Sequence, residues 1–258
     1  WARSGVSVAA MAPGGSDYPV LLPGPAYGDI QSGAHLAGGI AAALLRRERT
    51  GRGAVVDTSL LGSGMWAMQA SLAGAHLADR EALEQRDRLR PPNPLWNVYR
   101  TADDRFVTLS MLDSSRYWPG LCEALGRPDL IDDPRFATDE LRRRNSAECT
   151  AELGQLFAAH TLADMGGILG RQDGPWAAVN TPREVLADPQ AAANGLVQWV
   201  HYPGGTSLPL VPAPSRHDGH DPRLVPAPGH AADTDEVLLD AGYSMDRLIE
   251  LKVQGAIT

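Results

Sequence analysis

One acid stands where its position could support covalent chemistry: Asp29, in the stretch PAYGDIQSGAHLAGGIAAALLRRERTGRG, residues 25–53. A loop is expected to turn into a helix at this point. One interpretation makes Asp29 the N-cap, which accepts backbone N–H bonds at the start of the helix. The other makes it a nucleophile, because a carboxylate at the positive end of a helix dipole keeps its charge and nearby N–H groups can stabilise an oxyanion. The two roles are compatible, and the residues alone leave both open.

Other catalytic and ligand-binding motifs are missing or weak. The chain has no GxGxxG after a strand and no GxxxxGK[ST], so neither type of phosphate-binding loop is predicted. GSGMW, residues 62–66, lacks the serine-centred elbow of the α/β-hydrolases. His217 and His220, with the aspartates beside them, could contact a metal, but their proline-rich surroundings favour a solvated loop. The sequence predicts no metal site.

Composition narrows the class of protein and its surroundings. The 258 residues suffice for one large domain or two ordinary ones, and a net charge of −8 argues against a nucleic-acid partner. No apolar run reaches the length of a membrane span, and the N-terminus has no signal-peptide pattern, so we expect a cytoplasmic protein without membrane contact. Cys122 and Cys149 lack metal-ligand spacing and are expected to be reduced thiols.

The elements around Asp29 follow an α/β pattern. The spacing of apolar residues predicts a helix over residues 30–49, rich in small residues and expected to pack in the interior. Gly51 is predicted to close this helix in the left-handed conformation. A β-rich run over residues 54–61 predicts a strand, and a second helix with small residues is expected over residues 62–78.

The rest of the chain predicts a smaller α+β domain and a C-terminal segment. Residues 79–94 are charged and proline-rich, which indicates a boundary, and residues 95–112 form a hairpin candidate that turns at Asp103 and Asp104. Helices are expected near residues 115–125, 139–159 and 161–170, then two strands, and one or two helices within residues 233–257. The predicted core of the small domain is Trp96, Val98, Phe106, Val107, Leu109, Trp118, Leu121 and Leu125.

Several of these motifs together resemble one family. The Gly28-Asp29 pair is followed by Gly33, a helix of small residues, the run Thr-Gly-Arg-Gly over residues 50–53, and the sequence VDTSLL over residues 56–61. In this combination the chain resembles the family III CoA-transferases, of the carnitine-dehydratase and bile-acid-inducible F type. Formyl-CoA transferase and α-methylacyl-CoA racemase belong to that family. WARSGV at the start and the segments that begin at residues 93 and 233 extend the resemblance over the whole chain.

The resemblance implies a function and a site. Asp29 corresponds to the catalytic aspartate, which in the transferases attacks an acyl-CoA thioester and forms a mixed anhydride. Gly28, Gln31 and Gly33 would lie near the substrate; coenzyme A and acyl-CoA would be the substrates, with a carboxylic acid as acceptor and no metal. One alternative is an α-methylacyl-CoA racemase, in which the aspartate works with a histidine from upstream of Trp1. Another is a catalytically silent assembly partner.

The resemblance also implies an architecture. The fold class would be α/β, with a Rossmann-like large domain that is incomplete in this chain, a small α+β domain, and an interlocked homodimer. Residues 1–78 would supply the second part of the CoA-binding domain, residues 79–96 a connecting strap, residues 97–190 the small domain, and residues 191–258 the return segment with its helices. In the family, a portion before WARSGV carries most contacts to CoA. The family's glycine-rich loop is not evident around residues 88–97.

Overall fold

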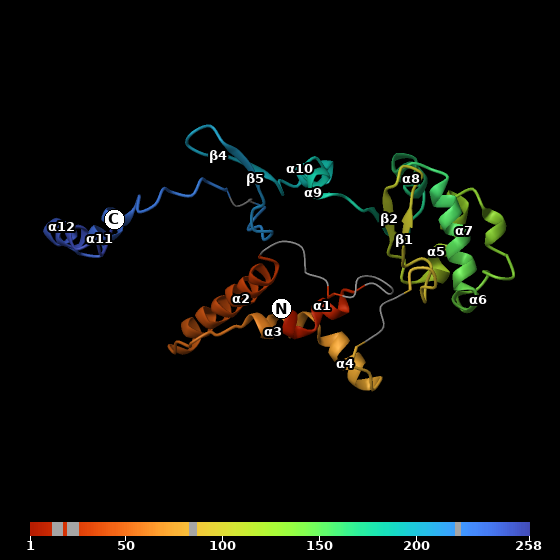
Figure 1. The fold of residues 1–258 in the computed structure, drawn as a ribbon, viewed down its shortest axis with the longest axis horizontal. Helices are drawn as coiled ribbons and strands as arrows, with labels where there is room; N and C mark the ends of the chain where they lie inside the picture. Colours follow the sequence, from red (N-terminus) through yellow and green to blue (C-terminus); the bar gives the residue numbers. More distant parts are fainter. Residues whose placement is uncertain (12–17, 20–25, 83–86, 220–222) are drawn as a thin grey trace. The chain divides into compact units, whose positions relative to one another are not determined.

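A computed structural model describes residues 1–11, 18–19, 26–82, 87–219 and 223–258 of the chain (Figure 1). Its contacts divide the chain into two units, Trp1–Val179 and Asn180–Thr258. Within the described ranges, no helix is both long enough and apolar enough to cross a membrane. The described elements are helices and two small antiparallel sheets.

The first part of unit 1 is helical. Its elements are η1 (Ala2–Ser4), α1 (Val6–Ala9), α2 (Tyr27–Thr50), α3 (Leu60–Ala67) and α4 (Gln69–Leu77). Helix α2 confirms the helix predicted over residues 30–49 and begins three residues earlier. Gly51 closes it with a φ of 69°, which confirms the left-handed cap. The helix predicted over residues 62–78 is divided into α3 and α4 at Met68, whose backbone leaves the helical conformation.

The prediction of a strand over residues 54–61 is wrong. Residues 52–59 have no regular structure, and α3 begins at Leu60. The Ser59 hydroxyl accepts a hydrogen bond from the backbone N–H of Gly62 at 3.0 Å, so the end of the β-rich run acts as a helix N-cap. A strand also needs a neighbour with which to pair, and no described residue pairs with this segment. A parallel sheet of the Rossmann type is therefore not formed within the described ranges.

The interior packing expected for the helix after Asp29 is also wrong. Ser32 is the one buried residue of α2, while Ile40 and Leu44 are 44% and 46% exposed. One close approach does occur: a Cβ on Gly39 would lie 2.9 Å from a methyl carbon of Val56. The small side chains of α2 thus allow local close approaches and leave most of the helix at the surface.

We call the second part of unit 1, residues 95–179, the small domain. It begins with a three-stranded antiparallel sheet, β1 (Val98–Arg100), β2 (Phe106–Leu109) and β3 (Trp176–Ala178), in the order β1-β2-β3. The hairpin of β1 and β2 confirms the prediction, and Asp104 in its turn has a φ of 58°. Strand β3, which pairs with β2, was not expected from the sequence. Three-residue strands carry too little pattern to be recognised in a sequence.

Five helical segments complete this domain: α5 (Ser114–Ala124), η2 (Pro128–Leu130), α6 (Asp139–Arg144), α7 (Ser146–Ala158) and α8 (Leu162–Leu169). They confirm the helices expected near residues 115–125, 139–159 and 161–170. In Figure 1, α7 runs beside the hairpin, and it packs against β1. The resulting core contains Tyr99, Trp118 and Phe157, and the Tyr99 and Phe157 rings stack with their centres 4.8 Å apart.

The predicted core of this domain is correct in part. Val107, Leu109, Trp118 and Leu121 are buried, and Leu125 packs against them. Trp96 and Phe106 were wrongly placed in the core, because they are 43% and 42% exposed, and Val98 is outside the buried cluster. The register pairs Tyr99 with Val107, so these two side chains face inward and their neighbours along each strand face the other way.

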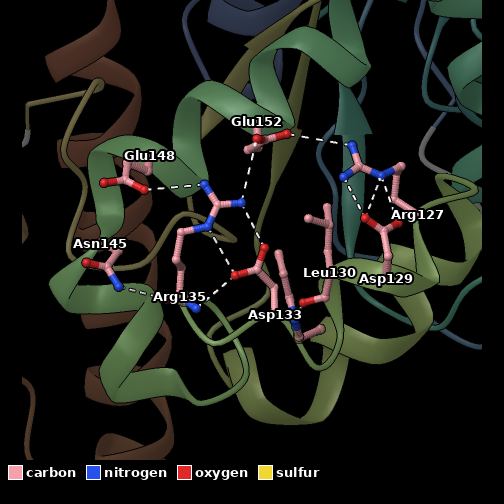
Figure 2. A network of polar contacts seen from close by, with 9 residues as sticks. Arg127, Asp129, Leu130, Asp133, Arg135, Asn145, Glu148 and Glu152 are labelled. Carbon is pink, nitrogen blue, oxygen red and sulfur yellow. Dashed lines mark hydrogen bonds and ion pairs between the residues drawn. The ribbon is translucent and has the colours of Figure 1, made fainter.

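Charged side chains connect the loop after α5 to α7 (Figure 2). Arg135 contacts Asp133 at 2.8 Å and Glu148 at 3.4 Å, and Glu152 lies between Arg135 and Arg127. Arg127 also forms a bidentate pair with Asp129, donating from Nε to Oδ1 at 2.8 Å and from Nη2 to Oδ2 at 2.7 Å. The guanidinium of Arg135 lowers the pKa of Asp133 below its ordinary value. This network holds the loop of residues 127–137 to one face of α7.

A buried cation and two thiols lie within the same domain. Arg142 donates hydrogen bonds to the Ser114 hydroxyl and the Phe136 carbonyl, and its guanidinium lies 5.0 Å from the centre of the Trp118 ring. Burial lowers its pKa. Cys122 and Cys149 are free and buried, as expected, and burial raises the pKa of each thiol to about 12. Both cysteines are therefore unreactive thiols of the core.

Unit 2 consists of short elements: α9 (Pro182–Val185), α10 (Pro189–Ala193), β4 (Gln198–His201), β5 (Ser207–Leu210), α11 (Thr234–Asp240) and α12 (Met245–Val253). Strands β4 and β5 form an antiparallel hairpin that turns at Gly204 and Gly205, both with positive φ. This hairpin and the two last helices confirm the C-terminal elements that the sequence predicts.

Candidate functional site

Asp29 lies in the first turn of α2, as its third residue. The N-cap is Ala26, which makes no side-chain capping bond, so the N-cap interpretation of Asp29 is wrong. Its side chain is exposed, and no hydrogen bond or ion pair involves its carboxylate within the described ranges. The free N–H groups of the first turn still place Asp29 where a helix favours negative charge. A nucleophile that acts on acyl-CoA would also need a cleft in front of Asp29, and this cleft is a prediction.

Gly28 allows the N-terminal residue to pack on the helix. A Cβ at Gly28 would overlap the indole ring of Trp1, which also meets the ring of Tyr27 edge-on with centres 5.7 Å apart. Ser4 approaches α3 in a similar way, since a Cβ at Gly64 would lie 2.7 Å from the Ser4 hydroxyl. The glycine before Asp29 thus serves the packing of Trp1 in this structure.

The surface beside Asp29 is open on the next turn of the helix. Gly33 follows Asp29 by four residues, which places the two on the same face of α2. Nothing lies within 4 Å of the position that a Cβ on Gly33 would take. Gln31 is half-buried, and the hydroxyl of the buried Ser32 has no hydrogen-bond partner among the described residues. An exposed carboxylate with free space beside it is accessible to an incoming thioester.

A second group of polar residues lies further along α2, and sequence reasoning missed it. His35 Nδ1 is 3.0 Å from the Ser63 hydroxyl, and the His35 ring meets the Trp66 ring at 74° with centres 6.5 Å apart. These residues line a pocket of about 360 Å³ together with Asp57, and Asp29 is not in its wall. The only hint in the sequence was the small residues that let α2 and α3 approach each other.

His35 does not pair with Asp29. Six residues of helix turn the chain by about 240° and advance it by about 9 Å, so the two side chains leave α2 on different faces. An acid–base pair of the kind that the racemase hypothesis needs is therefore not formed by these two residues.

Metal ligation finds no support in the part of the chain that the structure describes, where no group of three or more His, Cys, Asp or Glu side chains could hold an ion. His220 and Asp221 of the metal hypothesis lie outside the described ranges.

Comparisons with known proteins agree on one family. The model of CoA-transferase family III matches residues 1–234. The chain is 31% identical over 254 residues to cinnamoyl-CoA:phenyllactate CoA-transferase of Clostridium sporogenes, covering 98% of this chain and 61% of that protein. It is 27% identical over 275 residues to formyl-CoA:oxalate CoA-transferase of Escherichia coli O157:H7, covering 96% and 64%. The crystal structure of Rv3272 from M. tuberculosis superposes with a TM-score of 0.70 at 28% identity, covering 87% and 57%. The chain thus spans less than two thirds of the length of these relatives.

Proposed function

Because the chain belongs to CoA-transferase family III, we propose that it moves CoA between carboxylic acids, with Asp29 as the nucleophile. The names of its relatives favour transfer over racemisation, since the proteins of Clostridium sporogenes and Escherichia coli are both CoA-transferases. The observation that carries the proposal is the place of Asp29. It is an exposed carboxylate in the first turn of α2, within the family's motif, with open surface at Gly33.

The proposed reaction uses the Asp29 carboxylate in two successive exchanges. A carboxylate oxygen attacks the thioester carbonyl; the C–O bond forms, the C–S bond breaks, and CoA leaves as its thiolate. The thiolate then attacks the Asp29 carbonyl of the anhydride, which releases the first carboxylic acid and leaves an aspartyl-CoA thioester. The acceptor acid repeats these steps in reverse and leaves as its CoA thioester. No atom is lost, and each acyl transfer is divided into easier steps.

The chain's own groups would assist this reaction in two ways. The free backbone N–H groups at the start of α2 can donate to the oxyanion that forms when a carbonyl beside Asp29 is attacked. The absence of a side chain at Gly33 leaves room for the acyl group on the same face of the helix. We further propose Gly28 and Gln31 as neighbours of the bound substrate.

The proposal includes the architecture of the family. Residues 1–78 would form part of a Rossmann-like CoA-binding domain, residues 79–96 a strap, residues 97–190 the small domain and residues 191–258 the return segment, in an interlocked homodimer. Exposed apolar side chains on α2 and α3, such as Leu44, Leu45 and Trp66, support further burial of these helices in an assembly that would cover them.

Trapping of the intermediate tests the proposal. The enzyme is incubated with an acyl-CoA and then with hydroxylamine, which converts an activated aspartyl group to a hydroxamate, and the modified peptide is identified by mass spectrometry. We expect the hydroxamate at Asp29, and none in Asp29→Asn or when free CoA replaces the acyl-CoA. Transfer activity without a modified Asp29, or modification of another acid, would contradict the assignment. A protein without any transfer activity would favour the silent-partner alternative.

A further inference from the structure

A pocket in the small domain carries an unusual charge. It encloses about 470 Å³ between residues 88–90, the end of β1 and one face of α7. Arg88, Arg90 and Arg100 line it, and no carboxylate does. In a chain whose net charge is −8, three cations around one cavity without an acid in its wall form a local positive site. We call it the triple-arginine pocket.

The charges of this pocket are largely uncompensated. Arg100 pairs with Asp104 at 2.8 Å, but both side chains are mostly exposed, so the pair is weak and easily exchanged. Within the described ranges, the Arg88 and Arg90 guanidinium groups make no ion pair or hydrogen bond. The two side chains are therefore available to an anion from solution.

The segment that carries Arg88 and Arg90 is fixed to both walls of the pocket. The side-chain amide of Asn97, next to β1, donates to the Arg88 carbonyl at 3.0 Å. The Ser146 hydroxyl at the start of α7 donates to the carbonyl of Pro91. Asp87 closes a turn by accepting the N–H of Leu89 at 2.9 Å. A backbone held at these points needs little ordering on binding, so the remaining conformational cost is that of the arginine side chains themselves.

The opposite wall is small and mainly apolar. Ala147, Ala151, Gly154 and Ala158 follow one another at three or four residues along α7, and so share one face of the helix. The buried ring of Tyr99 adds an aromatic surface. Thr150 on the same wall is 5% exposed, and its hydroxyl makes no hydrogen bond of ordinary geometry. The pocket thus combines space for an apolar body with a nearly buried hydroxyl group beside Tyr99.

We propose that the triple-arginine pocket binds a phosphate monoester with an apolar body. Guanidinium groups bind phosphate oxygens through paired, charge-assisted hydrogen bonds, and a dianion matches three arginines better than a single carboxylate does. The volume is within the range of pockets that hold small organic ligands. The apolar body would lie against the α7 wall and Tyr99. The elements that form this pocket do not include the helix of Asp29. The proposal therefore does not depend on the proposed transferase function.

Binding of phenyl phosphate to the whole chain, measured by isothermal titration calorimetry, tests the proposal. Two comparison ligands are used. Inorganic phosphate lacks the apolar body, and benzoate lacks the second negative charge. We expect phenyl phosphate to bind more tightly than either. Arg88→Ala/Arg90→Ala should weaken it by about tenfold or more, because each charged hydrogen bond is lost. Ala151→Leu, on the exposed side of α7, should weaken it by filling the pocket while all three arginines remain.

A matched double variant separates the site from general charge. Arg46→Ala/Arg49→Ala removes two exposed arginines from the end of α2, so the net charge changes by the same amount. It should leave the affinity unchanged, as should Asp29→Asn, whatever the latter does to CoA transfer. Equal weakening by both arginine pairs, no effect of Ala151→Leu, tighter binding of benzoate, or no binding of phenyl phosphate would each overturn the proposal. Circular dichroism confirms that every variant is folded.

Discussion

Helices α2, α3 and α4 bury almost none of their apolar side chains, whereas α5, α7 and α8 bury theirs in a common core around Trp118 and Phe157. The helices with Asp29 are held by a few close contacts of small residues, such as Trp1 on Gly28. The small domain is held by stacked rings, buried aliphatic side chains and an ion-pair network. The two regions therefore differ in the interactions that stabilise them.

This difference predicts which substitutions should change stability and which should change activity. Burial of apolar surface supplies most of the free energy of folding, so the small domain should determine the measured stability. The exposed first turn of α2 contributes little to that core and is free to serve chemistry. Substitutions around Asp29 should change activity more than stability, and substitutions in the small domain the reverse.

The largest effect is expected for Asp29→Ala. In the whole enzyme this change should lower kcat for CoA transfer by several orders of magnitude, because the covalent route loses its nucleophile. The free energy of unfolding should fall by about 1 kcal/mol or less, the value of a charge near a helix N-terminus. Steady-state kinetics and urea denaturation measure the two quantities. A variant that unfolds early but keeps its turnover would give Asp29 a structural role only.

Trp118→Ala tests the other side of the comparison. Trp118 is 2% exposed, its indole N–H donates to the Leu130 carbonyl at 3.1 Å, and its ring packs edge-on against Phe136. Truncating it should lower the free energy of unfolding by about 3–5 kcal/mol. Trp96→Ala, a truncation of the same size at a 43% exposed position, should cost much less. Similar losses in urea denaturation would contradict the burial of Trp118 and the partial exposure of Trp96.

Gly28→Ala should be more harmful than Gly33→Ala. A methyl group at Gly28 overlaps the indole of Trp1, so the ring must move, at a cost of about 1–3 kcal/mol. At Gly33 the methyl group meets nothing within 4 Å, and alanine favours the helix by up to about 1 kcal/mol. Thermal unfolding and tryptophan fluorescence report the first effect. If Gly33 borders the substrate, its variant should raise KM without loss of stability.

Local patterns were sufficient to predict most elements of the small domain. The hairpin, the three helical stretches and the left-handed Gly51 depend on turn residues, alternation and capping, which act over a few residues. Residues 54–61 show the limit of this approach. Their β-branched residues favour a strand, but a strand forms only with a partner, and no described residue supplies one.

A candidate nucleophile could be proposed from the sequence, whereas the side chains that surround it in the structure could not be predicted. Asp29 was identified from a short motif, and its exposure beside Gly33 agrees with that role. The pairing of His35 with Ser63 joins residues 28 positions apart, and the triple-arginine pocket joins a segment interpreted as a boundary to a distant helix. Such long-range contacts depend on how helices pack, which the spacing of residues in one chain does not specify.

Gly51→Ala should have a moderate effect at the end of α2. Gly51 has a φ of 69°, a conformation that costs an alanine about 1 kcal/mol, while nothing crowds the position of its Cβ. Gly53→Ala is the matched control, since Gly53 is also uncrowded and has no positive φ. The loss should appear in urea denaturation for Gly51 alone. Equal effects at both positions would contradict a role of the left-handed cap.

The smallest effect concerns pH and the network of Figure 2. Arg135 lowers the pKa of Asp133 from its ordinary value of 3.8, so the carboxylate is favoured in the folded state. A group with a lowered pKa on folding stabilises the protein above its unfolded pKa, and this stabilisation is lost as the pH falls through the folded pKa. Asp133→Asn should therefore lower stability slightly at neutral pH and flatten its decrease below pH of about 4. Asp132→Asn is the control, because Asp132 makes no ion pair within the described ranges. Urea denaturation at a series of pH values separates the two variants. If the free energy of unfolding of Asp133→Asn fell with acid as steeply as that of the unchanged protein, this network would not contribute to the acid sensitivity of the domain.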